Sequence, residues 1–413
     1  MTHFFKGASI SFPDHDISTS RRRRSRVGAG LSWLAEINTR RAPSGALHIA
    51  CADPCAEARR RDVLRDEGHQ LAAQGQWHRL SERLADCDAA RDKTPGGKPK
   101  AELLAQGARR HLAPRLDRIQ RRGPSARDAH LRALFARTVD DPMLAAVLAV
   151  AHVDAARAKT SRRLFRKRRA VLAARHFERA EALLRPHEAR AIGAPLVAAA
   201  TCGLLAGRVD ARHRVVPDYE TLIDLDMDNP APMRSLGRQL LPTAFGARDT
   251  LEREAVRCAA RTRARWGEGG YTWVMLDAIR IDDAACAALD VDFFIDGLRD
   301  ILARDPSQTT VNLFAAALST LRTDAPSPSP RADANRARIA ACADWIVRDH
   351  LRELHPDVWL EERRGAAAGR LTPRQAEAER RAALDFLADH FTSEIAAGQQ
   401  IRFTEQGPVS GPV

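Results

Sequence analysis

Three aspartates alternate in the stretch LIDLDMDNPAPMRSLG, at Asp224, Asp226 and Asp228. Carboxylates in this spacing are typical of a calcium loop, which also needs a glycine at its sixth position and a bidentate glutamate at its twelfth. Those positions hold Asn229 and Ser235. Because the turn residue and the ligand that supplies two oxygens are both missing, the pattern argues against calcium, and no metal ligand is predicted.

The same stretch fits a joint between two packed helices. An apolar helical face ends at Leu225, residues 226–229 can form the turn, and Pro230 suits the first turn of the next helix, where its missing N–H has no partner. Apolar residues then recur at three- and four-residue spacing, at Met233, Leu236 and Leu240. The sequence therefore favours a joint between two helices over a metal site at this position.

This joint resembles the junction of tetratricopeptide repeats, which are helix-turn-helix units of about 34 residues. Asp226 and Asn229 match the turn of that family, and Met233 followed by Leu236 and Gly237 matches the start of the next helix. The resemblance implies antiparallel helix pairs that stack into a solenoid, because one pair cannot bury its apolar face alone.

Two further junctions echo the first, at Asp305-Pro306 and more faintly at Asp141-Pro142. The three turns are about 80 residues apart, not the roughly 34 of a regular array. The resemblance covers junctions only, so it implies a degenerate tetratricopeptide-like array.

A cluster of aromatic residues stands out in a chain with only 5% Phe, Trp and Tyr. Trp266, Tyr271 and Trp273 lie in WGEGGYTW, whose glycines could suggest a phosphate-binding loop. Such a loop follows a strand and is completed by Lys-Ser/Thr or a third spaced glycine, whereas a helical pattern precedes this segment. We expect the three rings to pack at a helix elbow, with the wall of a partner-binding groove as the alternative.

The basic residues suggest a second class of function, the binding of an anionic partner. The formal net charge is +13, and nearly all basic residues are Arg. An Arg-rich run at 21–26 and one helical segment are candidate anion-facing patches, although solvated charge is the commoner explanation of both. The helical patch comprises Arg162, Arg163, Arg166, Lys167, Arg168 and Arg169.

No linear catalytic motif is present. The 14 His form no H-E-x-x-H and no Gly-x-Ser-x-Gly surrounds a serine. Cys51 and Cys55 are spaced like zinc ligands, but no second Cys or His pair follows at ligand spacing. No catalytic or cofactor-binding residue is therefore predicted, and a role without catalysis is favoured, while an active site assembled only in space stays open.

The amino-acid composition indicates the secondary structure that surrounds these candidate residues. Ala and Leu carry the 44% hydrophobic share, and strand-length β-branched runs are scarce, so we expect an all-α protein. No stretch reaches ~18 uninterrupted apolar residues, which argues against a membrane span and makes cytoplasm the default. The predicted organisation is an irregular basic segment at 1–60, a helical array at 61–322, a Pro/Ser linker at 323–332, a helical extension at 333–397 and a flexible tail at 398–413.

The pattern as a whole predicts a non-enzymatic protein-interaction or scaffolding module that binds a peptide or a partner helix. A nucleic-acid or anionic-surface binder that uses the Arg-rich patches is the first alternative. An enzyme with a site invisible in linear sequence is the second.

Overall fold

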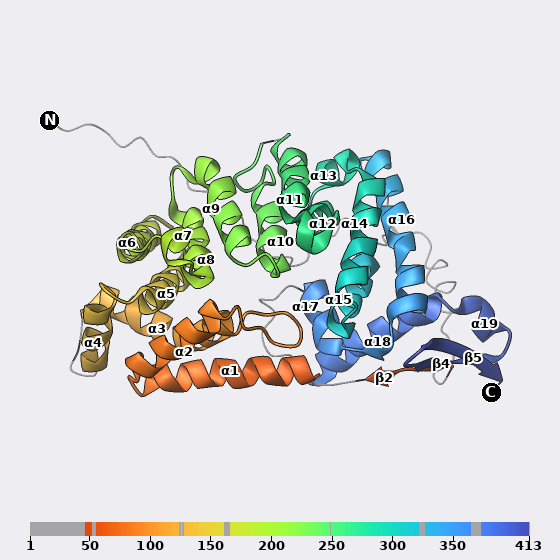
Figure 1. Ribbon diagram of the computed structural model, residues 1–413, viewed down its shortest axis with the longest axis horizontal. Coiled ribbons are helices and arrows are strands. Elements are labelled where there is room, and N and C mark those ends of the chain that lie inside the picture. Colours follow the sequence, from red (N-terminus) through yellow and green to blue (C-terminus); the bar gives the residue numbers. More distant parts are fainter. Residues whose placement is uncertain are drawn as a thin grey trace, which may run out of the picture. The chain divides into compact units, whose positions relative to one another are not determined.

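The computed structural model describes residues 46–51, 55–123, 125, 128–160, 166–247, 249–321, 327–364 and 373–412. Among these residues are nineteen α-helices and five short strands, so the all-α prediction is confirmed at the level of fold class (Figure 1). The chain divides into two compact units. The first is Arg60–Cys258, and the second is Ala259–Val413 together with the described residues of Asp16–Arg59.

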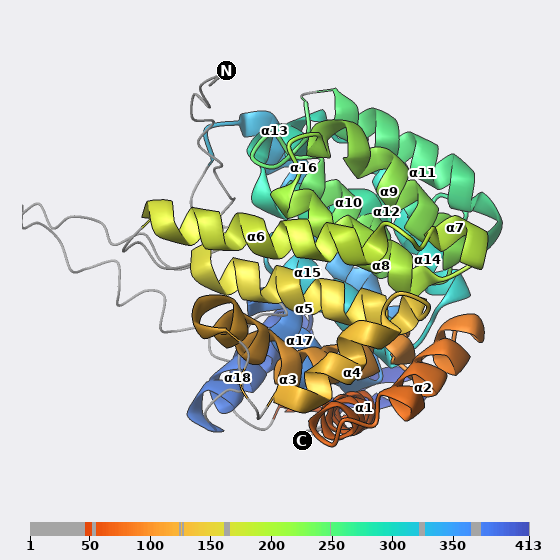
Figure 2. The same ribbon diagram turned by 90° about the vertical axis from the view of Figure 1, so that its left-hand side faces the viewer.

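The first unit is built from helices. They are α1 (Ala56–Ala73), α2 (Trp77–Ala89), α3 (Lys100–Arg122), α4 (Ala129–Arg137), α5 (Pro142–Thr160), α6 (Arg166–Leu184), α7 (Ala189–Ile192), α8 (Pro195–Leu204), the 3-10 turn η3 (Leu205–Gly207), α9 (Ala211–Leu225), α10 (Pro230–Gln239) and α11 (Thr250–Trp266). The chain passes between the units within α1 and within α11. Helix α5 lies between α3 and α6 (Figure 2), which accounts for a sequence that is apolar on nearly all sides.

The joint predicted at LIDLDMDNP is present. Helix α9 ends at Leu225 and α10 begins at Pro230. Asn229 caps α10, because its Oδ1 accepts the N–H of Ala231 at 3.1 Å. No group of three or more His, Cys, Asp or Glu side chains that could hold a metal ion occurs in the described part of the chain.

One guanidinium joins three helix ends in the first unit. Arg91 Nε donates to Leu225 O at 2.8 Å, Nη2 donates to Gly193 O at 2.9 Å, and Nη1 donates to Asp88 O. These carbonyls lie at the C-terminal ends of α9, α7 and α2, where helix carbonyls lack partners and a positive charge is favourable. Arg91 has a φ of 52°, the one positive φ of a described residue other than glycine.

The second unit continues with α12 (Gly269–Ile281), α13 (Asp283–Ala288), α14 (Val291–Arg304), α15 (Gln308–Ser319), α16 (Pro330–Trp345), the π-helical turn η4 (Ile346–His350), α17 (Pro356–Arg364), α18 (Pro373–Asp389) and α19 (Thr392–Ala396). Helices α12 and α14 approach so closely that a Cβ at Gly297 would lie 2.3 Å from Thr272 Oγ1. Their contact therefore needs glycine at this position.

Two small β-sheets belong to the second unit. Strand β1 (Leu47–His48) runs parallel to β4 (Gln399–Thr404), which forms a hairpin with β5 (Gly407–Pro412). Strand β2 (Ala50–Cys51) runs parallel to β3 (Glu353–Leu354). These strands correct two predictions, since residues 46–51 were expected to be irregular and residues 398–413 to be a flexible tail.

The hairpin is ordered by contacts that lie far from it in sequence. Ile401 is fully buried, and the Phe403 ring packs edge-on against Phe391 at a centroid distance of 5.8 Å. Arg352 Nε donates to Glu405 O at the hairpin turn, at 3.0 Å. Burial of these apolar side chains stabilises a segment whose Gly and Pro content is typical of a tail.

The boundaries between units also differ from the predicted ones. Helix α16, expected to open a separate extension, packs on α13 and α15 within the second unit. The predicted linker at 323–332 ends in a helix cap, because Ser329 Oγ accepts the N–H of Ala332 at 3.2 Å. The change of unit falls instead inside the predicted array, within α11.

Candidate functional site

The aromatic cluster predicted at the helix elbow lies inside the second unit. Trp266, Tyr271 and Trp273 are 2%, 0% and 1% exposed. Trp266 and Trp273 meet edge to face at 5.9 Å, while Tyr271 stacks on Phe293 at 4.5 Å. The rings therefore pack the α11–α12 elbow, as the sequence favoured, and do not wall an open groove.

The Arg-rich candidates lie largely outside the described residues. Residues 21–26, Arg162 and Arg163 are outside them, and of Arg166, Lys167, Arg168 and Arg169 the structure describes the helical backbone at the start of α6 but not the side chains. An anion-facing role for this patch stays a prediction.

The candidate site is built on residues 46–51, which change strand partner along their length. Leu47 and His48 pair with Ile401 and Arg402, whereas Ala50 and Cys51 pair with Glu353 and Leu354. One extended segment thus adjoins β4 first and β3 next. Both partners must be fixed for this segment to hold its place.

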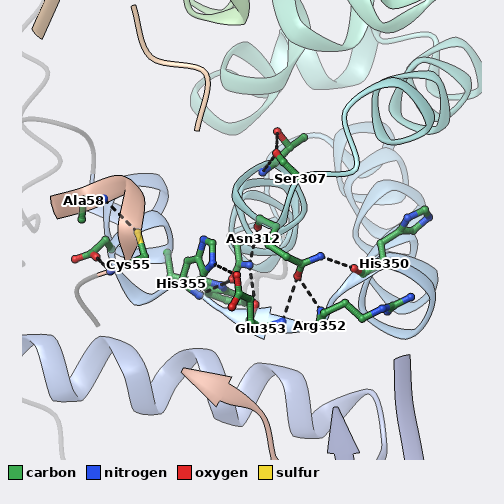
Figure 3. Close-up of polar contacts among 12 residues, drawn as sticks. Cys55, Ala58, Ser307, Asn312, His350, Arg352, Glu353 and His355 are labelled. Atoms are coloured by element: carbon green, nitrogen blue, oxygen red, sulfur yellow. Dashed lines mark hydrogen bonds and ion pairs between the residues drawn. The ribbon is translucent and has the colours of Figure 1, made fainter. Parts of the chain in front are cut away.

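Two amide side chains of α15 fix the β3 partner. Gln308 and Asn312 are one helical turn apart, and both form hydrogen bonds with residues 350–355. Figure 3 shows Asn312 beside Glu353 and His355. Gln308 Oε1 accepts the N–H of Arg352 at 2.8 Å and of Glu353 at 3.2 Å, and its Nε2 donates to His350 O at 2.9 Å. The Gln308 side chain thereby satisfies backbone N–H and C=O groups that a neighbouring strand would otherwise satisfy.

Asn312 completes the clamp. Its Nδ2 donates to Glu353 O at 2.9 Å and to Gln308 O at 2.7 Å, while its Oδ1 accepts from the His355 backbone N–H at 3.0 Å and from Trp359 Nε1 at 2.9 Å. All four hydrogen-bonding positions of this fully buried amide are used. Such a satisfied network holds its neighbours in one arrangement.

A thiol, an imidazole and a carboxylate lie near the clamp (Figure 3), and these are the residue types of a nucleophile, a base and an orienting group. His355 Nε2 is 2.8 Å from Glu353 Oε1. The Cys55 Sγ accepts the Ala58 N–H at 3.4 Å, and burial raises the pKa of this thiol, with the Asp357 carboxylate adding to the rise. Because a nucleophilic cysteine needs a readily formed thiolate, the buried Cys55 is better explained as the cap of α1.

Two arginines after α16 fix the C-terminal elements near β4. Arg348 donates to His390 O and, at 2.9 Å, to Glu394 Oε1, and its guanidinium lies 4.5 Å from the centroid of the Phe391 ring. Arg352 reaches the hairpin turn, as described above. Residues 348–353, at the end of η4 and directly after it, therefore support both partners of residues 46–51.

The orientation of the amides along residues 46–51 follows from one hydrogen bond. Ile401 N–H donates to Ala46 O at 2.7 Å, so Ala46 and His48 turn their amide groups toward β4. The backbone N–H and C=O of Glu353 point toward α15. The backbone amide groups that face β2 are therefore those of the residues on either side of Glu353. Because amides alternate along a strand, Leu47 and Ile49 turn theirs to the opposite edge.

The far edge of the β1-β4-β5 sheet is different. Since Ile401 faces β1, its neighbour Arg402 faces β5 and pairs there with Val409. The residues of β5 that alternate with Val409 therefore face outward: Pro408, Ser410 and Pro412. Only Ser410 among these has an N–H to donate, which protects this edge against pairing with another strand.

A hollow of about 380 Å³ opens where residues 46–51 leave β4 and join β3. Apolar residues line part of it, namely Leu47, Ile49, Ala50, Leu384 and Phe403. His48, Arg380 and Arg402 also line it, with the exposed Cys51. The lining contains no Asp or Glu, so the hollow is basic.

Comparisons with known proteins add no relative: no protein-family model matches the chain, and no curated protein or solved structure does. Within the described residues, no helix has the length and apolar character needed to cross a membrane.

Sequence reasoning missed this site because its parts are distant in the chain. Cys55 and Asp357, which share a hydrogen bond, are separated by 302 positions. Short strands such as β1 and β3 carry no periodic signal of their own. The available signal was the alternation of apolar residues in QQIRF, which marks β4 only weakly.

Proposed function

We propose that the chain is a non-enzymatic protein-interaction module that binds an extended peptide as an added strand beside residues 46–51. The contrast between the two sheet edges carries the proposal. Prolines remove N–H donors from the outer edge of β5, whereas Leu47 and Ile49 keep both amide groups on the edge that faces away from β4. Proteins usually protect exposed strand edges, and strand addition is a common mode of peptide recognition.

The charge near this edge favours an acidic peptide. His48 and Arg402 are paired neighbours on adjacent strands, so their side chains project from the same face of the sheet, and both are exposed. Ile401 and Phe403 occupy the opposite, buried face. A docked strand with carboxylates at alternate positions would place them toward His48 and Arg402, which improves association at low salt.

We also propose that the helices of this module form a tetratricopeptide-like array. The α9–α10 junction supports it, with a helix end at Leu225, a cap at Asn229 and a helix start at Pro230. A cytoplasmic location belongs to the same proposal, since none of the seven cysteines, all of which the structure describes, forms a disulfide, as is usual in a reducing compartment.

The test uses the purified full chain and a fluorescein-labelled peptide of alternating Glu and Val, with a Lys/Val peptide of equal length as the charge control. We expect saturable anisotropy for the Glu/Val peptide, with a dissociation constant on the order of micromolar, because a short interface of few hydrogen bonds is weak. Ile49→Pro removes one outward N–H and should weaken binding at least tenfold, while Ile49→Val keeps the N–H and should bind like the natural chain.

Three results would contradict strand addition: no saturable binding, equal binding of both peptides, or undiminished binding by Ile49→Pro. A labelled oligonucleotide tests the nucleic-acid alternative in parallel. Tight oligonucleotide binding that falls steeply with salt, together with no peptide binding, would replace the proposal by that alternative.

A further inference from the structure

The hollow at the point where residues 46–51 change strand partner has features of a small-molecule site. Its volume of about 380 Å³ lies within the range usual for ligand sites. Leu384 comes from α18, Phe403 from β4 and Ile49 from the segment between β1 and β2, so three elements distant in sequence contribute apolar lining. The hollow shares residues 47–51 with the sheet edge used above, whereas Leu384 on α18 lies outside that edge.

The polar lining is positively charged. Arg402 is exposed and forms no ion pair with a described residue, so a bound anion need not displace a carboxylate from it. His48, its cross-strand neighbour, adds a second nitrogen-bearing side chain. An arginine without a carboxylate partner offers the planar pair of N–H groups that a carboxylate accepts with two hydrogen bonds.

The second arginine is held in a fixed position. Arg380 donates from Nε to Glu377 Oε2 at 2.9 Å and from Nη2 to Glu377 Oε1 at 2.8 Å. These two bonds orient the Arg380 side chain at the hollow and offset its charge. Arg402 therefore supplies most of the charge available to a ligand, and Arg380 shapes the wall.

Hydrogen bonds and buried side chains hold the residues that line the hollow. Arg402 and Phe403 lie on β4, whose hairpin is held by Arg352 at Glu405 and by the buried Ile401. Residues 50 and 51 are held by β3, which the Gln308–Asn312 clamp fixes. A preformed site loses less conformational entropy when a ligand binds.

We infer that this hollow binds a small organic carboxylate, with the carboxylate on Arg402 and an aliphatic part against Leu384. Inorganic anions lack the apolar part, and neutral amides of the same shape lack the charge. The ligand class is therefore a monocarboxylate with a short hydrocarbon chain. This goes beyond the proposed peptide binding, although both ligands would use Arg402 and His48 and should therefore compete.

The test measures binding of hexanoate to the full chain by titration calorimetry and by ligand-detected NMR. Hexanamide is the neutral match and inorganic phosphate the anion without a hydrocarbon chain. We expect hexanoate to bind at least tenfold more tightly than either. Arg402→Gln should reduce hexanoate affinity at least tenfold, whereas Arg299→Gln, at an exposed ion pair with Asp296 on α14, should leave it unchanged.

Each other result overturns the inference. Binding of hexanamide as tight as hexanoate would show that only apolar contact is recognised, and equal phosphate binding would show a general anion site. Unchanged hexanoate affinity in Arg402→Gln would place the ligand elsewhere. The Ile49→Pro peptide experiment reports on a backbone N–H, so failure of either proposal can be told from failure of the other.

Discussion

Lys93 Nζ lies 2.7 Å from Asp226 Oδ1, and both side chains are largely shielded from water. The middle carboxylate of the alternating aspartates is thus the counter-ion of a lysine from the loop after α2. It ties that loop to the α9–α10 joint. The carboxylate that most resembled a metal ligand therefore serves the packing of helix ends.

Asp226→Asn should destabilise the first unit, because it leaves the Lys93 ammonium shielded from water without a negative partner. Loss of one member of such a pair typically costs about 3 kcal/mol. The measurement is urea unfolding followed by circular dichroism. Asp224→Asn is the matched control, since Asp224 pairs with the more exposed Arg190 and should cost less than about 1 kcal/mol. Equal effects of the two variants, or a rise in melting temperature on adding calcium, would contradict this assignment.

Arg91→Lys should also destabilise the first unit. A lysine can donate from one nitrogen only, so it cannot reach the carbonyls of Leu225, Gly193 and Asp88 together. We expect a loss of about 2 kcal/mol from the orphaned helix-end carbonyls, measured by the same unfolding experiment. Arg185→Lys, at an exposed position, is the control for the substitution itself. A neutral outcome for Arg91→Lys would show that water satisfies these helix ends.

The helices and their joints were predictable because their signals are local. Pro230 after Asn229 marks a helix start by backbone chemistry alone, and the structure places α10 there. The strands were not predictable, since Leu47 and Ile401 meet only after the whole chain has folded. Residues 398–413 were expected to be a flexible terminal tail. They form a hairpin instead, and on its edge strand β5 the missing N–H groups of Pro408 and Pro412 face outward.

Asn312→Ala should loosen the second unit around β3. The substitution leaves the His355 backbone N–H and the Trp359 indole N–H without an acceptor, at about 1–3 kcal/mol for each buried group left unsatisfied. Hydrogen exchange should accelerate at residues 353–359 before it changes in the first unit. Asn335→Ala is the matched control, because Asn335 donates a single hydrogen bond, to Cys286 O. Unchanged exchange at residues 353–359 would contradict the clamp.

Two buried groups in the first unit should give opposite pH dependences. His152 Nδ1 is 2.8 Å from His176 Nδ1, and burial, with His176 and Arg179 nearby, lowers the pKa of His152 to about 3. The unfolded chain takes up this proton near pH 6.5, so stability falls as pH drops from about 6.5 toward 3. Burial raises the pKa of Asp88 to about 6, so the folded chain holds a proton between about pH 4 and 6 that the unfolded chain has lost. That difference makes stability rise on acidification.

The two contributions overlap between about pH 4 and 6, and single variants should separate them. Asp88→Asn keeps an oxygen for the Leu196 N–H, which Asp88 Oδ1 accepts at 3.0 Å, but no longer titrates. Its stability should therefore fall more steeply on acidification than that of the natural chain, by up to about 1.4 kcal/mol per pH unit. The stability of His152→Gln should fall less steeply over the same pH range. Urea unfolding at half-unit steps from pH 4 to 7 gives the slopes, and parallel curves for all three chains would show that neither group changes its proton affinity on folding.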